Sequence, residues 1–427
     1  MSKHHQWLAQ QLPQWVDKAI INEEQAAALR ALYPVGDSIG LGRLLITGIG
    51  AIMIGLGVIL IFAYNWAEMG KFSKLVVVFS ALIGTHLAAI YSQQRSHVAS
   101  ESLFALGTML MGSGIFLTGQ IYHLDSHYPN AIFVWSLGAL ALAWTLPSLT
   151  QAFMAVALII IWHIAEVTDF HFANHTALLL ILFGLLPLVW RLHSPVLARF
   201  VSAAIFVSIG LSVGAYDDDL IVISLQLTAA AFIGLEQVMS LQTEKYKELT
   251  VELAKPAHWV FFVLLYLMTF DDFGYEFMRI RWSGYLSDVY FVTALLASQA
   301  SFFWLLVQRR VSALLWLTEI AVVLALLPSI ASLFTDVGGR HSAVHGLVWV
   351  GFNLLLLAVS VWLMTDGARN ANRQHMVRGS ILFALLAMAR YTDLFDSLLA
   401  RAVVFLLVGV ALFVVNHFYQ RNKRAAA

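Results

Sequence analysis

The sequence predicts an all-α protein: a polytopic transmembrane helix bundle of about 14 spans, preceded by a short cytoplasmic N-terminal helical hairpin. Of its 427 residues, 60% are hydrophobic and 12% are charged, whereas soluble domains carry about 25% charged residues. A soluble core cannot hide this much apolar surface, because single cores stop growing near ~250–300 residues. Lys plus Arg and Asp plus Glu are equal in number, so no excess positive charge is available to attract nucleic acid.

Long apolar runs mark the individual spans, because about 20 apolar residues cross the hydrocarbon layer as a helix. The clearest runs are residues 44–63, 75–91, 103–121, 131–146, 152–165, 177–190, 200–216, 220–235, 257–270, 289–307, 344–364 and 402–418. Two further runs involve charges: residues 311–334 contain Glu319, and residues 379–389 are bounded by Arg378 and Arg390. The short run spans only if both arginine side chains reach the interfaces.

Lys and Arg concentrate in alternate loops when the N-terminus is placed in the cytoplasm, as the positive-inside rule requires. Retaining the short span at residues 379–389 keeps the basic tail, residues 421–427, with the other cytoplasmic charges. We therefore expect both termini to be cytoplasmic.

The N-terminal segment reads as two amphipathic helices. Trp7, Leu12 and Trp15 recur at helical spacing, and Asn22 with Gln25 forms the signature of a capping box at the start of a second helix. We assign residues 1–38 to a hairpin, residues 39–420 to the bundle and residues 421–427 to the tail. The hairpin is too small to bury a core alone, so it either lies on the membrane face or against cytoplasmic loops, or it serves as a docking or self-association module.

Several short sequences resemble a known family. They are Gly48-Ile49-Gly50-Ala51 through Gly55-Leu56-Gly57, Ala63-Tyr64-Asn65-Trp66, Gly119-Gln120-Ile121-Tyr122-His123-Leu124, Trp135, and the Arg390-Tyr391 pair with Asp393 and Phe395. This succession resembles the uncharacterised bacterial multi-spanning membrane family catalogued as domain of unknown function 2157. The resemblance implies a multi-pass protein of the bacterial inner (cytoplasmic) membrane and brings no activity, cofactor or site residue with it.

Glu319 is the first candidate functional residue. An ionised carboxylate inside the membrane costs on the order of 2.5–3.5 kcal/mol on insertion scales. We expect Glu319 to face the bundle interior, where it serves as a proton or cation site or as a neutral acid hydrogen-bonded to a neighbouring helix.

A second candidate site lies after residues 103–121, on the predicted outer side. Gln120, His123 and His127 share one face if the helix continues, and Tyr122 and Asp125 lie beside them. A further polar group follows the fifth span: His163, Glu166, Asp169, His171 and His175. These side chains form a divalent-metal site, another polar site or interfacial anchors; because no HExxH-type spacing is present, we assign no metal ligand.

The last polar group is Arg390, Asp393, Asp396 and Arg401, which fits either a network of ion pairs between the final helices or an anion site. Asn353, within the run at residues 344–364, is a candidate for an interhelical hydrogen bond or a solute pathway.

The sequence favours a transporter-like protein, such as a permease, exporter or lipid flippase with a buried carboxylate, and no motif calls for an enzyme or a cofactor. The alternatives are a membrane assembly or sensor protein, and a membrane enzyme acting on a lipid-linked substrate at the outer face. Expected partners are the lipid bilayer, a small solute or lipid, and a protein at the hairpin, but not nucleic acid.

Overall fold

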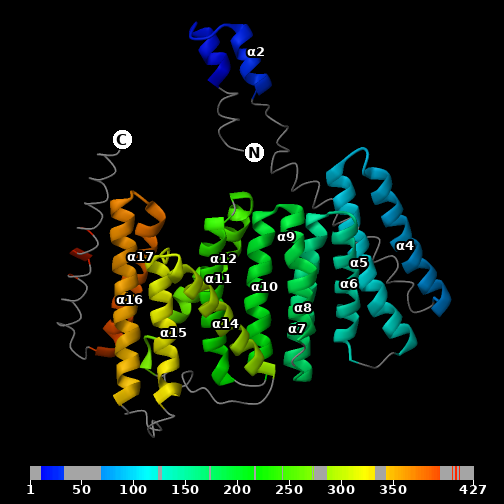
Figure 1. Ribbon diagram of the computed structural model, residues 1–427. Coiled ribbons are helices and arrows are strands. Elements are labelled where there is room, and N and C mark those ends of the chain that lie inside the picture. The colour runs from blue at the N-terminus through cyan, green and yellow to red at the C-terminus, as the bar shows by residue number, and fades with distance from the viewer. Residues whose placement is uncertain are drawn as a thin grey trace. The chain divides into compact units, whose positions relative to one another are not determined.

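The computed structural model (Figure 1) describes most of the chain, and every regular element in the described part is a helix. The described residues are 11–32, 69–123, 127–172, 175–215, 218–242, 244–271, 273, 286–331 and 343–394, with 406, 409, 410 and 413 singly. The first and last predicted spans, residues 44–63 and 402–418, lie outside the continuous described segments, as does the predicted boundary at residue 38. The chain divides into two compact units, Met1–Val77 and Val78–Ala427, which are treated separately.

The first unit contains the predicted helical hairpin. Residues 11–17 are helical, and α2 (Glu23–Leu32) follows. Asn22 Oδ1 accepts a hydrogen bond from the Gln25 amide at 2.8 Å, and the Asn22 amide donates to Gln25 Oε1 at 3.1 Å. This reciprocal pair is the capping box that the sequence predicts, and it satisfies donors that the start of a helix leaves free.

The second unit is the predicted helix bundle. Its helices are α4 (Lys71–Ser92, which begins in the first unit), α5 (His97–Tyr122), α6 (Pro129–Thr145), α7 (Leu149–Phe170), α8 (Thr176–Leu179), the π-helix η1 (Leu180–Leu185), α9 (Leu186–Leu192), α10 (Pro195–Gly214), α11 (Asp218–Gln242), α12 (Glu244–Leu267), α14 (Leu286–Val307), α15 (Ala313–Ala331), α16 (Ala343–Arg369) and α17 (Arg373–Leu394). In the described part, 8 helices are long and apolar enough to cross a membrane, and shorter apolar helices occur at Pro129–Thr145, Thr176–Leu192 and Ala313–Pro328. The prediction of an all-α polytopic bundle is therefore confirmed.

The helices of this unit run alternately up and down, with α8, η1 and α9 forming one continuous ascending segment (Figure 1). The helices α5, α7, α10, α12 and α15 end at the lower side of the view, and α6, α9, α11, α14 and α16 end at the upper side. We call these two sides the lower and upper faces. Three helices that descend from the upper face begin at a serine: Ser96, Ser148 and Ser194 each accept a hydrogen bond from the amide three residues on. Such N-caps explain where these helices start.

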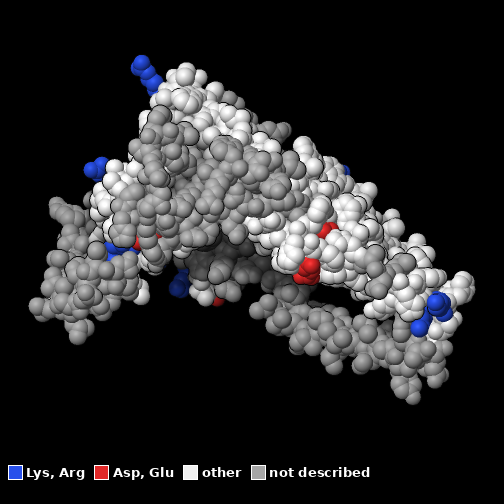
Figure 2. All heavy atoms as spheres, turned by 90° about the horizontal axis from the view of Figure 1, so that it is seen from below, with Lys and Arg blue, Asp and Glu red and all other residues white. Residues whose placement is uncertain are grey.

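Basic side chains are unevenly distributed between the two faces. By their place in the helices, the basic side chains described near the upper face are Arg95, Arg191, Arg199, Lys247, Lys255, Arg309, Arg310, Arg369, Arg373 and Arg378. Arg390 lies towards the lower end of α17, and Lys71 and Lys74 lie in the first turns of α4. Seen from below, the described residues are mostly uncharged, and acidic and basic side chains are scattered rather than gathered (Figure 2).

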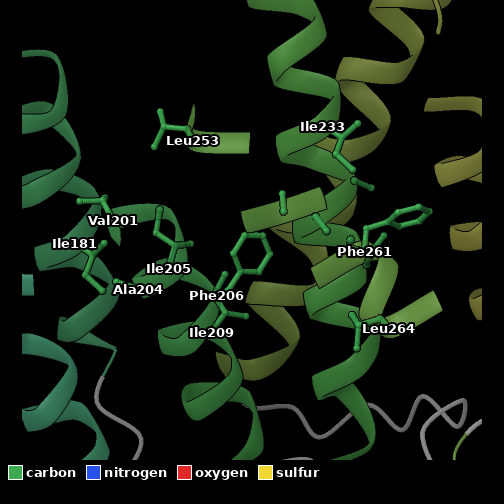
Figure 3. Packing of buried hydrophobic residues seen from close by; sticks show 14 of the residues in the cluster. Ile181, Val201, Ala204, Ile205, Phe206, Ile209, Ile233, Leu253, Phe261 and Leu264 are labelled. Carbon is green, nitrogen blue, oxygen red and sulfur yellow. The ribbon is translucent and has the colours of Figure 1, made fainter. Parts of the chain in front are cut away.

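Apolar side chains fill the centre of the bundle (Figure 3). Ile181 from η1 and Ile205 from α10 are almost fully buried, as is Phe261 from α12. The π-turn η1 precedes Pro187, which lacks an amide proton and cannot continue regular α-helical bonding. The Trp144 indole donates a hydrogen bond of 2.9 Å to the carbonyl of Gly184 within this turn, so the irregular backbone has a partner inside the bundle.

The short run at residues 379–389 lies within the longer helix α17, which is not among the 8 described helices that are long and apolar enough to cross a membrane. α17 has 22 residues and packs along α16. Gly379 makes this packing close: a Cβ there would lie 2.7 Å from the carbonyl oxygen of Ser360 on α16. A small residue at such a contact lets two helix backbones approach, as is common in membranes.

Candidate functional site

Glu319 lies inside the bundle and binds two polar side chains of the neighbouring helix. The residue is only 6% exposed. Ser298 Oγ donates to Glu319 Oε1 at 3.1 Å, and Gln299 Nε2 donates to Oε2 at 2.8 Å. Both partners are on α14, whereas Glu319 itself lies about 9 Å past the start of α15 at the usual helical rise. Both partners are uncharged, so the hydrogen bonds link α14 to α15 without neutralising a charge.

The third helix at this level is α11, which packs against both α14 and α15. Gly234 on α11 lies against Ser301 on α14, where a larger side chain would collide with the hydroxyl group. Lower on α11, Gln226 is 1% exposed, and neither polar atom of its amide has a hydrogen-bond partner among the described residues. The three helices therefore bury two strongly polar side chains, Glu319 and Gln226, within an otherwise apolar core.

The second predicted site forms a pocket at the lower ends of α5 and α6. Gln120, His123, His127 and Tyr128 line a cavity of about 550 Å³. The predicted reason for their proximity is wrong: α5 ends at Tyr122, and His123 takes a left-handed backbone conformation there. His127 lines the same cavity although it does not belong to α5. Tyr122 is half exposed and does not line it, and Asp125 lies outside the described residues.

His127 is held by a buried carboxylate. Its Nε2 lies 2.7 Å from Glu166 Oε2, and the Trp162 indole donates to Glu166 Oε1 at 3.0 Å. The side chain of Glu166 is 2% exposed, whereas that of His127 is 31% exposed. The carboxylate thus orients an imidazole that remains open to the cavity. This arrangement is suited to proton transfer.

Next to this pair, Tyr128 donates a hydrogen bond to Asp169 on α7. This hydrogen bond raises the pKa of the Tyr128 hydroxyl above its ordinary value of 10.0, with smaller contributions from desolvation and from nearby carboxylates. Tyr128 therefore stays a hydrogen-bond donor over the whole physiological range.

The histidines that the sequence groups after the fifth span do not share one site. His163 is fully buried, and its two ring nitrogens lie 3.1 Å and 3.3 Å from Ser208 Oγ and Ser212 Oγ on α10. His175 Nδ1 lies 2.5 Å from the Tyr290 hydroxyl, and burial lowers the pKa of His175. His171 is exposed. Over the described segments, no three His, Asp or Glu side chains come together in a way that could hold a metal ion.

Arg390 and Asn353 meet at the lower end of α12. Arg390 Nη2 donates to the Thr269 carbonyl at 2.8 Å, and Asn353 Nδ2 donates to the same oxygen at 3.3 Å. The predicted partners Asp396 and Arg401 lie outside the described residues, and of Asp393 only the backbone is described. Asn353 thus makes a hydrogen bond to the segment that directly follows α12.

Sequence reasoning missed a polar pocket between α12 and α17. Glu236, Lys255, His258, His375 and Arg378 all line this cavity of about 370 Å³ near the upper face. The available signal was that Lys255 and His258 fall inside α12, a helix apolar enough to span. Charged and titratable residues in such a segment are costly unless they serve a site.

Comparison with models of known families gives a match over part of the chain. No curated protein and no solved structure matches the chain. The model of a family described as "Predicted membrane protein (DUF2157)" matches residues 13–152, which include the hairpin, α4 to α6 and the beginning of α7. Residues 13–152 thus match the model of the family that the sequence resembles.

Proposed function

We propose that the protein is a transporter-like protein of the bacterial inner membrane in which Glu319 is the protonatable group. The observation that carries this proposal is the buried Glu319 carboxyl group, which has only neutral hydrogen-bond donors, Ser298 and Gln299, as its described partners. A buried carboxyl group without a cation gains or loses its proton according to its surroundings. Acidic residues of this kind mark proton and ion pathways in membrane proteins.

The proposed orientation places the upper face in the cytoplasm. Arg and Lys side chains dominate that face among the described residues, and the positive-inside rule assigns such a face to the cytoplasm. The even number of predicted spans then places both chain termini there.

Proton flux tests this proposal. The purified full-length protein is reconstituted into liposomes containing the pH dye pyranine, and internal acidification is recorded after a potassium diffusion potential is imposed. We expect wild-type vesicles to acidify faster than protein-free vesicles, and Glu319→Gln to reduce this excess at least tenfold. The matched control is Glu248→Gln, which changes an exposed carboxylate on α12. Equal rates for Glu319→Gln and wild type would rule out this role for Glu319.

A second candidate function is supported by the His127–Glu166 pair. A partly exposed imidazole held at 2.7 Å by a buried carboxylate and facing a cavity of about 550 Å³ is the arrangement of a general base. Under this alternative the protein is a membrane enzyme whose substrate enters at the lower face. Such an enzyme would lose activity on a lipid-linked substrate in His127→Gln, whereas a transporter that depends on Glu319 would keep its proton flux in the same variant.

A further inference from the structure

The pocket between α12 and α17 has charged and polar groups at one end. Glu236 comes from α11, Lys255 and His258 come from α12, and Gln374, His375 and Arg378 come from α17. Both α12 and α17 descend from the upper face, so these residues gather at the upper end of the cavity (Figure 1). Under the proposed orientation, this is the headgroup level of the cytoplasmic leaflet.

The same two helices supply an apolar lining farther down. On α12 the lining continues through Phe262, Val263 and Tyr266, and on α17 it continues through Ile381, Leu382 and Leu385. From Lys255 to Tyr266, and from Gln374 to Leu385, the descent is about 16 Å at 1.5 Å per residue. The cavity therefore changes from charged to apolar along the membrane normal, as a lipid molecule does.

The apolar side of the pocket is accessible from the surface of the bundle. Trp259 is 63% exposed, Val263 is 51% exposed and Ile381 is 53% exposed. In a spanning helix such side chains face the hydrocarbon layer. A ligand can therefore enter sideways from the bilayer, without passing through the bundle.

Several charged side chains around the pocket already have a partner of opposite charge. Lys255 forms an ion pair with Glu252, which also pairs with Arg199, and His375 Nδ1 lies 2.6 Å from Asp366. His258 Nε2 lies 3.5 Å from Glu236. Arg378, by contrast, is half-buried and makes no hydrogen bond or ion pair with any residue that the structure describes. Its guanidinium is the cation best placed to receive an anionic group.

We propose that this pocket binds a phospholipid, with the phosphate on the Arg378 guanidinium and one acyl chain along the apolar lining of α12 and α17. Guanidinium and phosphate form paired, charge-assisted hydrogen bonds. A free phosphate ion would use the upper end alone, whereas the lower end, lined by Phe262, Val263, Ile381, Leu382 and Leu385, offers apolar contact and suits part of a hydrocarbon chain. The Glu236 carboxylate opposes the phosphate and limits its affinity. This site is independent of Glu319, which does not line the pocket.

Binding of a fluorescent phosphatidylglycerol tests the proposal. The full-length protein in detergent micelles is titrated with the lipid carrying a nitrobenzoxadiazole group on one acyl chain, and fluorescence gives the dissociation constant. We expect Arg378→Gln to weaken binding at least tenfold. The matched control is Arg373→Gln, an exposed arginine on the same helix that does not line the pocket. Equal affinities for Arg378→Gln and Arg373→Gln would overturn the proposal.

Two further variants keep the test decisive if Arg378→Gln fails to fold. Glu236→Gln is expected to tighten binding severalfold, because it removes a like charge; unchanged or weaker binding counts against the proposal. Leu385→Trp narrows the apolar end and is expected to weaken lipid binding about tenfold.

Inorganic phosphate distinguishes a lipid site from a simple anion site. We expect phosphate at millimolar concentration to leave the lipid bound. If phosphate displaces the probe and Leu385→Trp binds like wild type, the pocket is an anion site and not a phospholipid site.

Discussion

Arg390 on α17 donates a hydrogen bond of 2.8 Å to the carbonyl oxygen of Thr269, a buried residue just past the end of α12. The same oxygen accepts a bond of 2.9 Å from the indole of Trp349 on α16. The Arg390 guanidinium also lies 5.3 Å from the centre of the Trp349 ring. Helix ends leave carbonyl groups without intrahelical partners, and here side chains from two later helices satisfy one of them. Arg390 thus helps to join α12, α16 and α17.

Replacing Arg390 by Gln should destabilise this junction. The variant loses a charge-assisted hydrogen bond to a buried carbonyl, and such bonds contribute about 1.5–3 kcal/mol. We expect the free energy of unfolding, measured by SDS titration in mixed micelles, to fall by that amount. Arg373→Gln serves as the control because Arg373 is exposed at the other end of α17. A loss no greater than that of the control would show that the Thr269 contact contributes little.

The His127–Glu166 pair should show energetic coupling. The buried Glu166 carboxylate accepts hydrogen bonds from Trp162 and interacts with His127 at 2.7 Å. A double-mutant cycle with His127→Ala and Glu166→Gln should give a coupling energy of about 0.5–3 kcal/mol in unfolding experiments. Strictly additive effects of the two substitutions would mean that the pair does not form in the membrane.

Gly379 should tolerate no side chain. A Cβ at this position meets the backbone of α16 at Ser360 and Met364, which cannot rotate away as a side chain can. We expect Gly379→Ala to reduce the free energy of unfolding by about 1–3 kcal/mol. Gly346→Ala on α16 is the matched control, because its added Cβ meets nothing within 4 Å. If both variants are equally stable, α17 does not pack against α16 at this contact.

His175 should make the fold sensitive to acid. Burial lowers its pKa below the ordinary value of 6.5, so the unfolded chain binds the proton more readily than the folded chain. Stability is therefore complete above pH 6.5, approximately, and decreases as the pH falls towards the folded pKa. Its titratable neighbours are Tyr290, in contact with Nδ1, and the buried His163.

The corresponding measurement compares unfolding temperatures at pH 7.5 and 5.5. We expect wild type to lose stability on acidification, and His175→Gln to start lower at pH 7.5 but to change less between the two pH values. An identical pH response in the variant would assign the acid sensitivity to other groups.

The helices could be predicted from sequence because membrane spans depend on local composition. The capping box at Asn22 and Gln25 and the burial of Glu319 follow from rules that act within one segment. The apolar run at residues 379–389 is shorter than the helix that contains it, because α17 continues on both sides through the charged residues Arg378 and Arg390. Hydropathy measures apolar composition and does not register where a helix continues through charged residues.

The sites were less predictable, because they combine residues from distant helices. Nothing in the sequence around Arg378 indicates that α12 lies beside α17 and brings Lys255 and His258 to the same pocket. Similarly, the sequence groups His163 with His127, yet His163 turns to Ser208 and Ser212 on α10 instead. Residue type and spacing identify candidates, but helix packing decides which of them meet.

The direction of the helices is the claim on which the proposed sites depend, and single-cysteine labelling tests it most directly. The chain contains no cysteine, so Gln93→Cys, Asn370→Cys and His171→Cys each introduce one thiol at an exposed position. Spheroplasts expressing each variant are treated with a membrane-impermeant maleimide before and after permeabilisation. We predict that His171→Cys reacts in intact spheroplasts, whereas Gln93→Cys and Asn370→Cys react only after permeabilisation. Labelling of all three positions from the same side would contradict the bundle as a set of alternating membrane-crossing helices.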